Sequence, residues 1–178
     1  MFRRIKDRFK HKSALKFLRE EFGKPASNID RSKGITSVGC IVDLDKFEKS
    51  ELFFELIEEF KLMPNAVKII GYRSFYDKNS PYSTPVFSDK DLGWKGAIQN
   101  SYALEFLSRE YDLLINYYNE ENLLLQLMSV KTKARVKVGF KEIDEKYNDL
   151  ILNIPLKDFR LFKLELKKYL KVFNEIEK

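Results

Sequence analysis

The fold class is decided by the run Tyr111-Asp-Leu-Leu-Ile-Asn-Tyr-Tyr118 and by the run Ala134-Arg-Val-Lys-Val-Gly-Phe140 that follows it. Both runs have the length and the β-rich, apolar composition of strands, and the Leu-rich residues 119–133 between them have the length of one helix. A strand, a helix and a strand with so few spare residues predict a βαβ unit, which implies a parallel pair with a right-handed connection. We therefore expect an α/β protein.

Three further apolar runs predict strands, at residues 35–42, 66–72 and 150–154. The first is almost continuous in apolar and β-branched residues, as a central parallel strand is. Only about eight polar residues precede residue 150, too few for a full crossover helix, so we expect the last strand to pair antiparallel. The pattern predicts a three-layer sandwich with about five mostly parallel strands.

Helices are predicted between these strands and at the end of the chain. Asp45 and Glu48 have the spacing of a helix N-cap and its capping box, and residues 101–109 form a second helical segment. Residues 156–178 predict a last helix that docks on the sheet. Its apolar stripe consists of Phe159, Phe162, Leu166, Tyr169, Leu170 and Phe173.

Positive charge is concentrated at the start of the chain. Residues 1–34 hold eleven Lys and Arg against four Asp and Glu, whereas residues 35–178 hold twenty-two against twenty-three. Residues 23–34 have the composition of a linker. We therefore expect a basic helical arm with its linker at residues 1–34 and a single α/β domain at residues 35–178.

The arm is helical in pattern over residues 2–22, but its apolar residues lie on two faces. The triplets, about 140° apart on a helix, are Phe2, Ile5 and Phe9, and Leu15, Leu18 and Phe22. One straight helix packed on the domain would leave one triplet exposed. Two short amphipathic segments with a break near Ser13 fit this pattern better.

The arm is the first candidate binding site, because its charge indicates an anionic partner. The cations expected to contact it are Arg3, Arg4, Lys6, Arg8, Lys10, Lys12, Lys16 and Arg19. The partner is then RNA, most plausibly the ribosome, or an anionic membrane surface into which Phe2, Ile5 and Phe9 insert.

The long connection at residues 73–100 is the second candidate site, because long loops in compact domains are often functional. It follows the carboxyl end of a strand, where open α/β sheets place ligands. Its expected binding surface consists of Tyr72, Arg73, Tyr76, Tyr82, Phe87, Trp94 and Lys95. Packing of the rings on the domain, and stacking of the rings on bases or a protein partner, remain equally open.

Lys133, Arg135 and Lys137 alternate with apolar residues and predict one basic strand face. Such a strand is expected near a sheet edge. Two interpretations remain open, and they are compatible with each other. The cations either protect the edge from pairing with other chains or contact phosphates.

Evidence for an enzyme is weak. Asp43 and Asp45, after the first predicted strand, have a spacing that suits Mg²⁺ in a phosphate or nucleotide-sugar enzyme, but a helix cap and a solvated strand end explain them better. Phosphate-binding glycine loops are absent, the one histidine is His11 in the arm, and Cys40 has the setting of a buried apolar residue. We expect no cofactor and favour a non-catalytic role.

The compartment is expected to be the cytoplasm. A single cysteine excludes a disulfide framework. The N-terminus never develops the apolar core of a signal peptide or a membrane span.

The runs Phe87-Ser-Asp-Lys-Asp-Leu-Gly-Trp-Lys-Gly96, Tyr111-Asp-Leu-Leu-Ile115 and Ala134 to Phe140 resemble an uncharacterised family of short α/β proteins from Bacteroidota. The likeness spans roughly residues 35–175 and implies a cytoplasmic single-domain protein, with no catalytic residues to carry over. Residues 112–140 are also similar to a strand-helix-strand of heptosyltransferase-type glycosyltransferases, which implies a Rossmann-like fold. The leading hypothesis is a non-catalytic RNA- or ribosome-binding protein whose domain docks a protein or RNA partner.

Overall fold

The computed structural model describes residues 2–22, 24, 34–77, 79 and 82–176, without the side chains of residues 2 and 3. Most of the predicted linker therefore lies outside the described residues. The division into an arm and a domain stays a prediction, because its boundary falls in that stretch.

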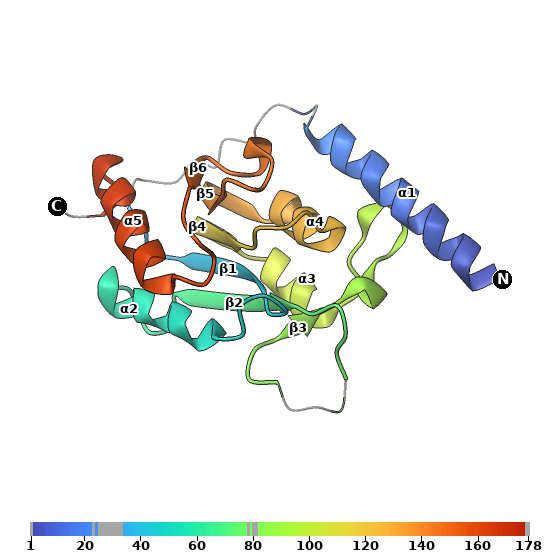
Figure 1. Ribbon diagram of the computed structural model, residues 1–178, viewed down its shortest axis with the longest axis horizontal. Coiled ribbons are helices and arrows are strands. Elements are labelled where there is room, and N and C mark those ends of the chain that lie inside the picture. Colours follow the sequence, from blue (N-terminus) through green and yellow to red (C-terminus); the bar gives the residue numbers. More distant parts are fainter. Residues whose placement is uncertain (1, 23, 25–33, 78, 80–81, 177–178) are drawn as a thin grey trace.

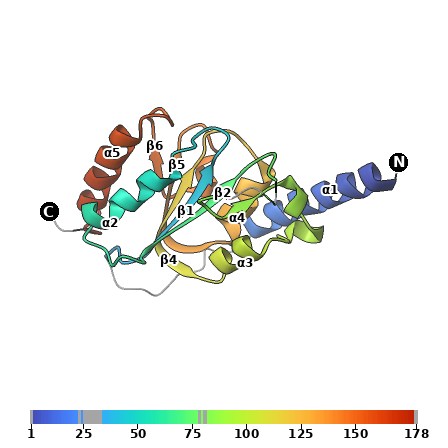
Figure 2. The ribbon, with the colours of Figure 1, turned by 90° about the horizontal axis from the view of Figure 1, so that it is seen from below.

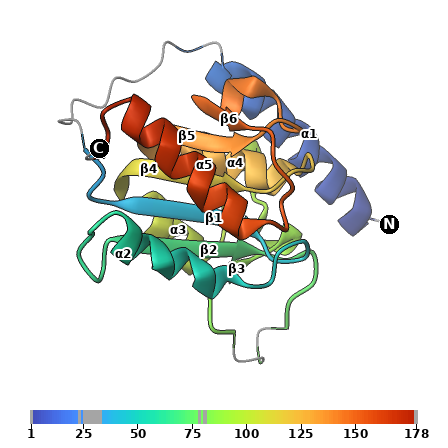
Figure 3. The same ribbon diagram turned by 60° about the vertical axis from the view of Figure 1, so that its left-hand side comes forward.

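Six parallel strands form one sheet in the order β3-β2-β1-β4-β5-β6, as Figure 3 shows. They are β1 (Val38–Asp43), β2 (Val67–Tyr72), β3 (Val86–Phe87), β4 (Glu110–Tyr117), β5 (Lys133–Phe140) and β6 (Leu150–Leu152). The predicted α/β class is confirmed. The sheet has one strand more than predicted, because β3 is a two-residue strand inside the long loop and is too short to leave a periodic pattern.

Helices cover both faces of the sheet, as Figures 1 and 2 show, so the three-layer arrangement is confirmed. The α-helices are α1 (Phe2–Phe22), α2 (Glu55–Glu59), α3 (Ser101–Leu107), α4 (Leu123–Lys131) and α5 (Phe159–Val172). Short 3-10 helices are η1 (Ser50–Phe54), η2 (Asp89–Asp91), η3 (Trp94–Gly96) and η4 (Glu145–Tyr147). α2 and α5 pack on one face, and α1, α3 and α4 pack on the other.

Two hydrophobic clusters, one on each face, explain why the central strands are apolar throughout. In β4, Leu113 and Ile115 belong to the cluster under α2 and α5, whereas Leu114 belongs to the cluster under α3 and α4. A parallel strand buried on both faces has no polar side.

β6 runs parallel to β5, so the predicted antiparallel pairing is wrong. Its three residues pair only with the last residues of β5, from Val138 to Phe140. After β5 ends at Phe140, the chain has to return only to the level of Val138 before β6 begins. The short helix η4 and its flanking turns are enough for this return. Residues 141–149 are thus a shorter connection than the dozen or more residues that usually join two parallel strands.

Two predicted helix ends are wrong. Asp45 lies in a turn and caps no helix; its Oδ2 accepts a hydrogen bond from the amide of Ser74 at 2.8 Å, and helical structure starts only at Ser50. The loop after β2 supplies this amide at the carboxyl edge of the sheet. At the other end, α5 stops at Val172, so Phe173 leaves the buried stripe and is 46% exposed.

The central pair, β1 and β4, is fixed at its start by the carboxylate of Asp112. Its Oδ2 accepts hydrogen bonds from the amide and hydroxyl of Thr36 at 2.9 and 2.6 Å, and from those of Ser37 at 3.0 and 3.1 Å. These bonds set the register in which Val38 pairs with Leu113.

The strand order reverses direction between β1 and β4. From β1 the chain proceeds outward to β2 and β3, and from β4 it proceeds outward to β5 and β6. Open α/β sheets bind ligands outside the carboxyl ends of the strands at such a reversal. The loops after β1 and β4 therefore lie where such folds bind ligands.

Candidate nucleic-acid interface

α1 is one continuous helix, so the predicted break near Ser13 is wrong. The Ser13 hydroxyl donates to the carbonyl of Lys10 at 2.8 Å and accepts from the amide of Lys95 at 3.0 Å. Ala14 is fully buried and Leu18 is 4% exposed in the cluster that contains α4. The apolar residues of the second half of α1 pack against α4 and η4, so the two apolar triplets do not have to share one face.

Aromatic rings complete the docking of this half. The Nζ of Lys131, in the last turn of α4, lies 4.1 Å from the centre of the Phe17 ring, and burial lowers the pKa of this lysine. Phe22 meets Tyr147 edge-to-face at 4.9 Å, and Lys146 Nζ lies 4.7 Å above the Phe22 ring. These contacts tie α1 to α4 and to η4.

The turn around η3 is the second support of α1. Lys10 Nζ donates to the carbonyl of Leu92 at 3.2 Å. Gly96 has a φ of +70°, and a Cβ at this position would lie 2.8 Å from Leu127 and 3.0 Å from Phe17. Glycine therefore allows this turn to lie directly against both α1 and α4.

The opposite side of α1 is basic and faces solvent. At about 100° per residue, its cations fall within about 120°: Arg4, Arg8, Lys12, Lys16 and Arg19, all exposed. We call these residues the outward basic face. Among the described residues, Lys16 alone of this set pairs with a carboxylate, at 3.8 Å from Glu20. Ile5 and Phe9 are exposed on the same side, at 45% and 57%.

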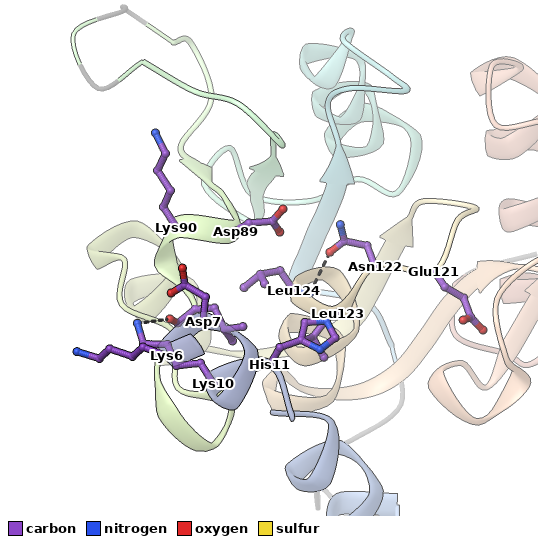
Figure 4. A pocket seen from close by; sticks show the side chains of 11 residues that line it. Lys6, Asp7, Lys10, His11, Asp89, Lys90, Glu121, Asn122, Leu123 and Leu124 are labelled. Carbon is purple, nitrogen blue, oxygen red and sulfur yellow. Dashed lines mark hydrogen bonds between the residues drawn. The ribbon is translucent and has the colours of Figure 1, made fainter. Parts of the chain in front are cut away.

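The first half of α1 extends past the body of the molecule, as Figure 2 shows. On its inner side it forms one wall of a groove of about 780 Å³, whose other walls are η2 and the start of α4 (Figure 4). Lys6, Lys10 and Lys90 line this groove together with the carboxylates of Asp7, Asp89 and Glu121, so charges of both signs face it. The groove was missed in the sequence because its walls come from three distant segments.

The aromatic surface predicted for the long loop after β2 consists of buried residues and exposed residues. Tyr72 and Phe87 belong to the core, where their rings lie 5.6 Å apart, so their prediction as surface residues is wrong. Both side chains belong to strands, at the ends of β2 and β3. Tyr82 and Trp94 are exposed, at 37% and 49%. The other predicted members are Arg73 and Tyr76, which are half-buried, and Lys95, which is exposed.

Asp43 and Asp45 hold the backbone of the carboxyl edge. Asp43 is buried, its Oδ1 accepts from the amide of Asp45 at 3.0 Å, and burial raises its pKa. Asp45 lies 3.9 Å from Arg73. In the part of the chain that the structure describes, no three His, Cys, Asp or Glu side chains gather as metal ligands would. Asp43 and Asp45 therefore stabilise the backbone at the carboxyl edge of the sheet.

The basic residues of β5 are engaged within the molecule. Lys133 pairs with Glu110 at 3.5 Å, Arg135 pairs with Glu175, and Lys137 Nζ donates to the carbonyl of Ser129 at 2.6 Å. Burial lowers the pKa of Lys137. β6 pairs with β5 only from Val138 onward, and the backbone of Lys137 is hydrogen-bonded to Asp149 just before β6. The structure does not bring the three cations to the outward basic face.

A model of a protein family of unknown function, DUF6913, matches residues 10–173. The chain belongs to this family. No curated protein and no solved structure matches it. The DUF6913 match includes the docked half of α1 and the whole sheet, and residues 2–9 precede it. Within the described residues, no helix has the length and apolar character needed to cross a membrane.

Proposed function

We propose that this member of DUF6913 is a non-catalytic cytoplasmic protein that binds RNA, with the ribosome as the favoured partner, through the outward basic face of α1. The observation that carries the proposal is the division of α1 into two sides. One side is buried through Ala14 and Leu18, and the other presents exposed cations from Arg4 to Arg19. The α/β body then holds this helix at a fixed angle to the bound partner and offers its own surface for docking.

The spacing of the cations suits a polyanion. At 1.5 Å per residue, Arg4 and Arg19 lie roughly 22 Å apart along the helix axis. Each phosphate neutralised by a cation releases counterions and steepens the dependence of affinity on salt. If every cation of the outward basic face meets one phosphate, affinity falls about 100-fold or more between about 50 and 200 mM salt.

A membrane surface is less favoured as the partner. A helix that lies on a membrane needs an apolar face that is free to enter the lipid. The apolar side of the second half of α1 is occupied by the protein's own core, which leaves Ile5 and Phe9 as the described apolar side chains for this purpose. An enzyme at Asp43 and Asp45 is not favoured either, because both carboxylates accept backbone amides. An origin in Bacteroidota and the likeness to heptosyltransferases stay predictions, and neither supports the proposal.

The test is a charge reversal on the outward basic face. Arg8→Glu combined with Lys12→Glu should lower affinity for a fluorescein-labelled RNA hairpin, and for purified ribosomes in sedimentation, by at least about tenfold at about 50 mM salt. The slope of log affinity against log salt should fall by about 1 for each phosphate that no longer meets a cation. The matched control is Lys157→Glu with Arg160→Glu, which makes the same charge change at exposed positions near the start of α5.

Equal reductions in affinity in the two double variants would show that net charge, and not α1, governs binding, and would overturn the proposal. Unchanged RNA and ribosome binding in Arg8→Glu with Lys12→Glu would also overturn it. Flotation with vesicles of neutral and anionic phospholipid distinguishes membrane binding from RNA binding. Only the membrane alternative predicts that the protein floats with anionic vesicles and that Ile5→Ser with Phe9→Ser abolishes this flotation.

A further inference from the structure

A second hollow, of about 500 Å³, lies under the loop that follows β2. Its walls are Phe75, Tyr76, Asp77, Lys90, Asp91 and Gln99. Phe75 is 74% exposed, more than any other large apolar residue among those described. A hollow of this volume is in the range that binds a small ligand.

Aromatic rings lie close to cations in this hollow and in the loop beside it. Lys90 Nζ lies 5.5 Å from the centre of the Phe75 ring, and the guanidinium of Arg73 lies 5.8 Å from that of Tyr82. Tyr76 and Tyr82 lie 5.8 Å apart in a tilted pair. A flat ring beside a fixed cation suits a nucleotide, whose base stacks on the ring while its phosphate meets the charge.

Lys90 connects this hollow with the groove beside α1, because it lines both. In Figure 4 its side chain points away from Lys6 and Lys10, toward the loop after β2. Lys90 is the one cation among the described residues that line the hollow, and Lys6 and Lys10 are the next cations toward α1, with Asp7 and Asp89 between the two cavities. A single strand lying along this path would place a base in the hollow and its neighbouring phosphates at Lys90 and Lys6.

The polar walls of the hollow suit the edge of a base. The carboxylate of Asp91 already accepts hydrogen bonds from the amide of Ser88 at 2.8 Å and from Asn100 Nδ2 at 3.2 Å, which stabilise its negative charge. Asp77 and Gln99 are exposed and present oxygen and amide groups beside the rings. Such groups hydrogen-bond base edges once a base has left its helix.

We propose that this hollow binds an unpaired base, so that the RNA recognised by the protein contains a single-stranded segment. The inference rests on the proposed RNA-binding function and specifies its ligand. A duplex keeps its bases stacked and paired, so it can reach the outward basic face of α1 but cannot fill the hollow.

The test compares Phe75→Ala with Phe54→Ala on two probes, a single-stranded RNA and a blunt duplex of the same sequence. Phe54 is a matched control, because it is an exposed phenylalanine, at 49%, in η1 on the other face of the sheet. Phe75→Ala should weaken single-strand binding at least about fivefold, the lower end of what one stacked base contributes. Duplex binding, and both affinities of Phe54→Ala, should stay within about twofold of the wild type.

Lys90→Gln gives an independent readout in the same titrations. It should lower the salt slope for the single strand by about 0.7, the contribution of one phosphate contact, and should leave the duplex slope unchanged.

The outcomes separate the two proposals. Equal effects of Phe75→Ala on both probes, or no effect on either, would overturn the base-binding hollow while RNA binding through α1 stands. If the wild-type protein binds neither probe and does not sediment with ribosomes, the proposed function itself fails and the hollow fails with it.

Discussion

Arg135 and Glu175 form the most buried ion pair among the described residues, with side chains 13% and 7% exposed. Both guanidinium Nη atoms donate to the Glu175 carboxylate at 2.6 Å, and this carboxylate also accepts from the amide of Gly34 at 3.0 Å. Removing one partner of such a pair leaves a buried charge without compensation, which costs far more than removing an exposed pair. The sequence predicted Arg135 as part of a basic surface, because nothing in the sequence shows that residue 175 returns to meet it.

Arg135→Met should lower the free energy of unfolding by about 3–5 kcal/mol, since Glu175 then stays buried without its cation. The matched control is Lys133→Met on the same strand, whose exposed pair with Glu110 is worth less than about 1 kcal/mol. Urea unfolding followed by circular dichroism measures both. Similar decreases in the two variants would contradict the role assigned to the buried pair.

At the scale of the elements, α1 depends on the turn around η3 as much as on α4. The Asp91-Leu-Gly-Trp-Lys-Gly96 stretch could be predicted only as part of a long loop with functional potential. In the structure it supports a helix that precedes it by some eighty residues, through Leu92 and the amide of Lys95. Gly96 is required there because of its positive φ and its two close neighbours.

Gly96→Ala should destabilise the protein by about 1–3 kcal/mol, from the cost of a side chain at positive φ and from the clash with Leu127 and Phe17. Hydrogen exchange should rise selectively in residues 10–22, as α1 loosens. Ala97→Gly is the control at the neighbouring exposed position, where φ is −63°, and it should cost less than about 1 kcal/mol. Unchanged exchange in α1 of Gly96→Ala would refute the supporting role of the turn.

Most elements could be predicted from the sequence, because apolar runs and helical periodicity are local signals. Their ends could not. Asp45 and Glu48 have the spacing of a capping box, but the amide of Ser74 from a neighbouring segment uses the carboxylate of Asp45. The predicted break near Ser13 failed for a related reason: the apolar pattern was expected to pack along its whole length, whereas only half of α1 meets the body.

At the scale of the molecule, the order of strands and the groove could not be predicted, because both depend on which distant segments meet. The basic character of α1 was evident from composition. Which of its cations face outward became evident only once Ala14 and Leu18 were seen to be buried. Tyr72 and Phe87 were predicted to be on the surface but are buried, because the aromatic residues at the two ends of the loop belong to strands β2 and β3.

Alkaline stability is also a property of the whole molecule, because buried tyrosines lie on both faces of the sheet. Burial raises the pKa values of Tyr72, Tyr111, Tyr117 and Tyr118 above their ordinary range, and raises the pKa of Tyr147 to about 12. Above pH of about 10 the unfolded chain loses these protons while the folded protein keeps them. The folded state then binds more protons than the unfolded state, so stability is complete below pH of about 10 and falls as pH rises further.

The free energy of unfolding should therefore decline steeply between pH values of about 10 and 12. Tyr147→Phe should make that decline shallower. The difference in tyrosinate absorbance between the wild type and this variant should show the hydroxyl of Tyr147 titrating near pH 12. A Tyr147→Phe profile parallel to that of the wild type would contradict the burial effect at this residue.

The pairing of Val38 with Leu113, held by Asp112 against Thr36 and Ser37, has a kinetic consequence. β1 pairs on one edge with β2, which is the next strand along the chain, but its other edge pairs with β4, which is far away in the sequence. Mixed folds with such remote contacts refold in times on the order of milliseconds or longer. Until β4 is in place, the edge of β1 from Val38 to Val42 that faces it stays unpaired, and an unpaired apolar edge of this kind favours association with other chains during folding.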